Sequence, residues 1–213
     1  MSEMPAAEVA REPWVPSPGR GRVNQKQRTR RAIVDAAKRL AASGGEITMP
    51  VVAREALVSE ATAYRYFPDL ASLLREADDG TWPSPEDALA PVAGCTDVVE
   101  RVGFAAEFLF RGVLANQGAV RAMIAASITK PGATSRPAHR LGLIDHALAP
   151  AAERLGADGL AQLRRDLIVV LSADALLTVI DLSGLGPEAA IASAVETARR
   201  VTRAALAEAD AAN

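Results

Sequence analysis

The chain has 213 residues, of which 49% are hydrophobic and 4% aromatic, and its formal net charge at pH 7 is −2. A chain of this length forms one or two small domains, and this apolar fraction is sufficient for a buried core. The wealth of alanine and leucine with few aromatics favours an all-α fold, and the near-neutral charge excludes a protein that is basic over its whole surface.

The single cysteine, Cys95, excludes an intramolecular disulfide and a cysteine metal cluster, which is typical of a reducing compartment. The N-terminal residues contain no apolar core of signal-peptide length. No uncharged apolar stretch is long enough to span a bilayer. We therefore expect a cytoplasmic protein without a membrane segment.

Residues 1–21 predict an unstructured arm, because four prolines and two glycines interrupt any helix there. Arg20 and Arg22 are able to reach an adjacent minor groove of DNA, as the arms of other DNA-binding domains do. A flexible leader that contacts nothing is the simpler interpretation.

A helix is expected from about Val23 to Ser43, with an apolar stripe from Ile33 to Ala41 and a stop at the following glycines. Eight basic residues and one acid lie between positions 20 and 39, so the positive charge of the chain is concentrated here. A solvated charged face would explain this pattern. Because a helix–turn–helix follows, we instead expect Thr29 and Arg30 to meet phosphates.

The stretch from Thr48 to Leu74 predicts two short helices joined by a tight turn. Thr48 is placed to cap a helix that runs to about Ala56, and Ser59 is placed to cap a second helix that Pro68 stops. Such a unit places its second helix in the major groove of DNA.

This stretch and the helix before it resemble the TetR family of transcriptional regulators over residues 24–75. The matching recognition pattern consists of Ser59, Thr62, Ala63, Tyr64, Tyr66, Phe67 and Leu73. The resemblance, with the basic helix, implies a DNA-binding set of Thr29, Arg30, Thr48, Ser59, Glu60, Ala61, Thr62, Tyr64, Arg65 and Tyr66.

Three residues depart from the family pattern. Leu57 stands where the family has a turn glycine, Ala63 replaces a larger apolar residue, and Leu70 stands where a lysine often contacts phosphate. These departures leave open an alternative function, a helical interaction or ligand-binding protein that has lost strong DNA binding.

Beyond Pro68 the pattern stays helical, and about nine helices are expected in all. The further helices are predicted at about Val98–Leu114, Gln117–Ile128, Ala138–Leu155 with a kink at Pro150, Leu160–Leu182 and Pro187–Ala209. We divide the chain into an arm (1–21), a helix–turn–helix domain (22–68) and a ligand-binding and dimerisation domain (69–213).

The family resemblance implies a homodimer that pairs through its last two helices and binds a palindromic operator. It also implies a repressor that an unidentified small-molecule effector releases from DNA. The predicted helix from Leu160 is the most apolar in the chain, which suits burial in such an interface.

The sequence contains no catalytic motif, so we expect no enzyme activity, no cofactor and no metal. His139 and His146 are seven residues apart, too far for a common zinc pair on one helix, and we expect ordinary surface histidines.

Asp174 and Thr178 lie one turn apart in an apolar segment, with Asp145 predicted nearby. A carboxylate there should be exposed, paired or directed into a polar part of a cavity. The predicted ligand-binding set is Phe104, Phe108, Met123, Ser127, Leu141, Asp145, Leu171, Asp174 and Thr178. With few aromatics available for stacking, an aliphatic or amphipathic ligand is favoured; a role in the ordinary core is the alternative for each residue.

Overall fold

The computed structural model describes residues 18–43, 47–78, 80, 82–129 and 139–212. This part of the chain is all-α, as expected. The helices are α1 (Pro18–Ala42), α2 (Met49–Glu55), α3 (Glu60–Tyr66), α4 (Leu70–Asp78), α5 (Pro85–Ala88), α6 (Val98–Ala115), α7 (Gln117–Thr129), α8 (His139–Leu148), α9 (Ala152–Val170), α10 (Ala173–Ser183) and α11 (Pro187–Ala212). Short 3-10 turns occupy Ala90–Val92 and Ala149–Ala151.

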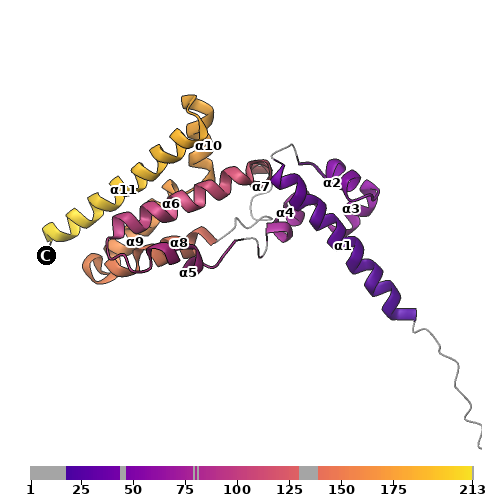
Figure 1. Ribbon diagram of the computed structural model, residues 1–213, viewed down its shortest axis with the longest axis horizontal. Coiled ribbons are helices and arrows are strands. Elements are labelled where there is room, and N and C mark those ends of the chain that lie inside the picture. The colour runs from indigo at the N-terminus through magenta and orange to yellow at the C-terminus, as the bar shows by residue number, and fades with distance from the viewer. Residues whose placement is uncertain (1–17, 44–46, 79, 81, 130–138, 213) are drawn as a thin grey trace, which may run out of the picture.

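The helices fall into two groups (Figure 1), and each group encloses its own hydrophobic core. Helices α1 to α4 enclose the first, whose fully buried side chains include Ile33, Val52 and Phe67. The second core lies in the bundle made by α6 and α8 to α11, around residues such as Phe110 and Leu167. The helix–turn–helix and the bundle are therefore distinct packing units.

Helix α7 joins the two cores. Ala119 belongs to the first core, and Ala122 and Met123 pack against it, whereas Val120 packs against the second core. The first core also includes Leu73 and Ala77 of α4. We therefore move the proposed boundary of the N-terminal domain from residue 68 to Asp78.

Helix α1 begins at Pro18, earlier than expected. Proline suits the first turn of a helix, where its missing N–H is not needed, and glycine weakens a helix without forbidding it. The expected arm therefore loses its last residues to α1, while residues 1–17 lie outside the described residues.

The apolar segment predicted as one helix from Leu160 to Leu182 is two helices, and that prediction was wrong. Helix α9 ends at Val170, and the backbone of Leu171 leaves the helical region at φ −83°, ψ 55°. The Ser172 hydroxyl accepts a hydrogen bond of 3.1 Å from the Ala175 N–H and so begins α10. A serine cap therefore overrides the continuous apolar pattern. The expected break at Pro150 is present, as the 3-10 turn Ala149–Ala151.

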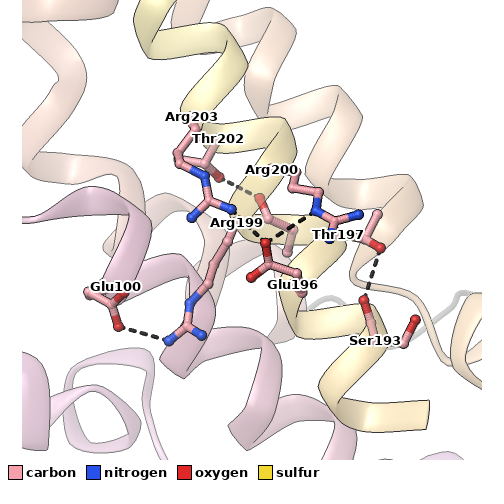
Figure 2. A network of polar contacts seen from close by, with 9 residues as sticks. Glu100, Ser193, Glu196, Thr197, Arg199, Arg200, Thr202 and Arg203 are labelled. Carbon is pink, nitrogen blue, oxygen red and sulfur yellow. Dashed lines mark hydrogen bonds and ion pairs between the residues drawn. The ribbon is translucent and has the colours of Figure 1, made fainter. Parts of the chain in front are cut away.

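Helix α11 packs along α6 in the bundle. Figure 2 shows Arg199 of α11 reaching Glu100 of α6, with 2.8 Å between Nη2 and Oε2. The stem of Arg199 crosses α6 at Gly103, where a β-carbon would collide with the guanidinium. The missing side chain at Gly103 thus leaves room for the Arg199 guanidinium to reach Glu100.

Arg101 of α6 holds three chain segments together from inside the bundle. It is 4% exposed, and its guanidinium donates hydrogen bonds to the carbonyl oxygens of His146 (2.7 Å), Ala147 (3.2 Å) and Val92 (2.8 Å). Two of these carbonyls lie at the end of α8, where the helix dipole favours a cation. Arg101 therefore fixes α8 and the loop before α6.

Replacing Arg101 with methionine should lower the free energy of unfolding by about 3 kcal/mol, because buried carbonyls would lose a charged donor. Urea unfolding followed by circular dichroism measures this change. Arg111→Met is the control, since Arg111 is an exposed residue of the same helix whose partners are Glu107 and Glu188. The free energy of unfolding of that variant should stay close to the wild-type value. Equal losses in both variants would contradict the role assigned to Arg101.

Candidate functional site

Two short helices, α2 and α3, meet at a tight turn at the end of the molecule away from the bundle (Figure 1). Thr48 occupies the N-cap of α2 with an extended backbone, but its side chain makes no capping hydrogen bond, unlike the expectation. Ser59 caps α3 as expected: its Oγ accepts from the Thr62 N–H at 3.2 Å and donates to the Thr62 hydroxyl at 2.9 Å. The start of α3 is therefore fixed by a side chain.

Helix α3 has one buried and one open face. Ala63 and the following Phe67 are 0% and 1% exposed and face the first core. The open face carries the residues predicted for DNA contact: Ser59, Glu60, Ala61, Tyr64 and Arg65 are exposed, and Thr62 and Tyr66 are half-buried. The structure thus brings this part of the predicted set onto one continuous surface.

Arg30 does not belong to this open surface. It forms a two-pronged ion pair with Glu76 of α4, with 2.8 Å between Nε and Oε1, and donates to the carbonyl of Tyr66 at 3.3 Å. Its guanidinium also lies 4.4 Å from the ring centre of Phe67. The guanidinium of Arg30, predicted to meet phosphates, ties α1 to the end of α3 and to α4.

Two residues near the start of α1 were missing from the predicted set. Gln25 and Lys26 line a surface hollow together with Arg65 and Tyr66. Thr29, from the predicted set, is half-buried and donates its hydroxyl hydrogen to the Gln25 carbonyl at 3.1 Å. The basic composition of α1 was visible in the sequence, but only packing shows which of its side chains reach α3.

The turn between α2 and α3 carries backbone strain at Leu57. Its φ is +56°, in the left-handed region, and its side chain is 93% exposed. Leu70, the other departure, is half-buried and packs against the first core. A leucine at position 70 therefore adds to packing where a lysine would contact DNA.

Comparison with protein-family models matches residues 33–77 to bacterial regulatory proteins of the tetR family. Residues 33–77 are the N-terminal helix–turn–helix domain of the TetR family. The match covers the C-terminal part of α1, all of α2 and α3 and most of α4, and it confirms the resemblance seen in the sequence. The match covers these residues alone and shows that this part of the chain is a domain of the kind found in bacterial regulatory proteins. A search of curated proteins found no match to the chain.

A cavity of about 280 Å³ lies between the TetR domain and the bundle. The residues of α1 and α4 that line it are Lys38, Ala41, Ala42, Ala71, Leu74, Arg75, Ala77 and Asp78. The other lining residues are Trp82, Leu109, Val113, Asn116, Ala119, Val120, Met123, Ile124, Ser127, His139, Arg140, Leu171, Ala173 and Asp174. Most of this wall is apolar.

The structure places four of the predicted ligand-binding residues on the wall of this cavity: Met123, Ser127, Leu171 and Asp174. The other five lie elsewhere. Phe104 and Phe108 pack against the second core, Leu141 is half-buried on α8, and Thr178 is exposed. Asp145 is exposed and paired with Arg164, with 2.5 Å between its Oδ1 and Nε.

Trp82, Asp78 and His139 form a polar corner of the cavity that sequence reasoning missed. The Trp82 indole N–H donates to Asp78 Oδ1 at 2.8 Å, and its ring stacks on the imidazole of His139 with 4.2 Å between centroids. Trp82 fits against α6 because Gly112 has no side chain there. His139 is therefore no ordinary surface histidine; burial lowers its pKa, Arg140 acts in the same direction, and Asp78 opposes them.

Within the described ranges, no helix has the length and apolar character needed to cross a membrane. Among the same residues, no three histidine, cysteine or acidic side chains gather as metal ligands would.

Replacing Leu57 with glycine should raise the free energy of unfolding of the TetR domain by up to about 1 kcal/mol, because glycine adopts positive φ without the clash of a β-carbon. Leu57→Ala is the matched control. It removes the same exposed side chain but keeps the β-carbon, so its stability should stay near the wild-type value. Thermal unfolding of the three proteins measures the difference, and an equal gain in both variants would show that the strain is not at φ.

Proposed function

We propose that the protein is a ligand-responsive repressor that binds a palindromic operator as a homodimer. The observation that carries this proposal is the open face of α3, which presents Thr62, Tyr64 and Arg65 to solvent within a TetR domain. A helix of this kind contributes base contacts from its first turns and phosphate contacts from its flanks. The proposal places the protein in the cytoplasm, where bacterial DNA lies.

Two copies are needed because one helix–turn–helix reads only a half-site. We place the dimer contact on α10 and α11, with the neighbouring end of α9. Leu182 of α10 and Val169 of α9 are 83% and 71% exposed. A groove between α9 and α11 with a mostly aliphatic lining, including Leu163, Val201 and Ala205, adds to the apolar surface. Burial of such side chains against a second copy would stabilise the dimer.

The cavity between the TetR domain and the bundle is the proposed effector site. A ligand bound there contacts Leu74 and Ala77 of α4, which also belong to the first core together with Ala63 of α3. A ligand shifts the balance between a DNA-binding and a released arrangement only if it binds one of them better. Because the cavity lies at the junction of the two parts, a movement of the TetR domain relative to the bundle changes the cavity wall and so the affinity for a ligand.

Selection from random DNA duplexes, followed by binding measurements over a salt series, tests this function. Enriched duplexes should contain inverted repeats, and affinity should fall steeply as salt increases because phosphate contacts release counterions. Absence of binding to any duplex at about 50 mM salt would refute the repressor and favour the alternative of an interaction protein without strong DNA binding.

Substitutions on α3 separate phosphate contacts from base contacts. Tyr64→Phe should weaken binding to all duplexes by a similar factor, whereas Thr62→Ala and Arg65→Ala should also relax preference at particular base pairs, by about 1–3 kcal/mol each. Arg111→Ala, on the exposed surface of the bundle, is the control and should bind as the wild type does. Equal, sequence-independent losses from all three α3 variants would contradict the assigned roles.

A further inference from the structure

The wall of the cavity is shared between the two parts of the protein. Helix α1 contributes Lys38 and Ala41, and helix α4 contributes Leu74 and Asp78, while α6, α7, α8 and the start of α10 close the other sides. A molecule inside therefore touches the TetR domain directly, without an intervening layer of side chains.

The size and lining of the cavity limit what it can hold. Its volume of about 280 Å³ is nearly twice that of the engineered cavity of about 150 Å³ that binds benzene. Leucine, valine, isoleucine, methionine and alanine side chains supply most of the wall. An apolar molecule the size of two fused rings satisfies both limits.

The charged groups on the wall do not favour a charged ligand. Lys38 and Arg75 are exposed at the rim, and Asp78 already accepts a hydrogen bond from Trp82. Arg140 and Asp174 each have interactions of their own. The wall carries both signs of charge, so a ligand with a full charge would lose hydration without gaining a dedicated counter-ion.

His139 carries a buried polar atom at this wall that the described residues leave without a hydrogen bond. Its Nε2 is buried and has no hydrogen-bond partner among the described residues. A buried polar atom without a partner is costly, so a ligand that supplies one recovers free energy. Burial lowers the pKa of His139 and so favours the neutral imidazole, in which one ring nitrogen donates and the other accepts. Because either neutral tautomer is available, Nε2 can serve as the donor or as the acceptor without any change in the stacking on Trp82.

We propose that the cavity takes an uncharged, mainly apolar ligand about the size of two fused rings, and that the imidazole of His139 recognises its single hydroxyl or carbonyl group. The ligand lies against α1 and α4 and so acts at the junction itself. Its effect on DNA rests on the proposed function, but its recognition by His139 does not.

Calorimetric titration with 2-naphthol and with 2-methylnaphthalene tests the recognition, because the two probes differ by a hydroxyl in place of a methyl group. The wild type should bind 2-naphthol about tenfold more tightly than 2-methylnaphthalene, which is the gain expected for one hydrogen bond to a buried group. The indole N–H resonance of Trp82, assigned with Trp82→Phe, should shift with both probes and so place them in the cavity.

His139→Phe keeps a ring against Trp82 but removes both nitrogens. This variant should bind the two probes within about twofold of each other, while His139→Gln, which can still donate and accept, should retain part of the preference. His146→Phe is the control on the same helix, outside the cavity wall, and should keep the full preference. Circular dichroism and the thermal midpoint establish that each variant is folded.

Three results would overturn the inference: no binding of either probe to the wild type, equal affinity of the wild type for both, or an undiminished preference in His139→Phe. DNA binding is measured separately, with and without 2-naphthol. A protein that binds no DNA yet distinguishes the probes through His139 would refute the repressor and leave the ligand recognition intact.

Discussion

The contact of α7 with α1 and α4 is the constraint on which the arrangement of the two parts depends. Ala119 is 7% exposed and lies in the core of the TetR domain, and its neighbour Val120 packs against the bundle. Small side chains on α7 let the helix lie close to α1 and α4. The cavity adjoins this contact, so the segment that joins the cores also borders the proposed effector site.

Arg30 has a similar role within the TetR domain. A long basic side chain near the end of a helix suggests a phosphate contact, yet the guanidinium of Arg30 is held by Glu76, by the Tyr66 carbonyl and by the ring of Phe67. Through these contacts Arg30 fixes the position of the end of α3 relative to α1 and α4. Two other cations, Lys26 and Arg65, line a surface hollow beside the end of α3.

The departures from the family pattern have different physical consequences. Leu57 keeps the left-handed backbone that a turn glycine would adopt, so the turn geometry is retained at the expense of local strain. Leu70 exchanges a charged contact for packing against the first core. Ala63 is fully buried beneath α3. The domain thus keeps the backbone shape of the recognition unit with apolar side chains at these three positions.

The sequence by itself determined the all-α fold, the helix–turn–helix, the Ser59 cap and the open face of α3, because periodicity, capping and turn chemistry act between residues close in the chain. It did not determine that Arg30 pairs with Glu76, that the apolar segment breaks at Leu171, or that Trp82, Asp78 and His139 meet at one cavity. These depend on contacts between distant segments or on a cap that competes with an apolar pattern. Only the tertiary structure decided them, since local pattern carries no information on which helix faces which.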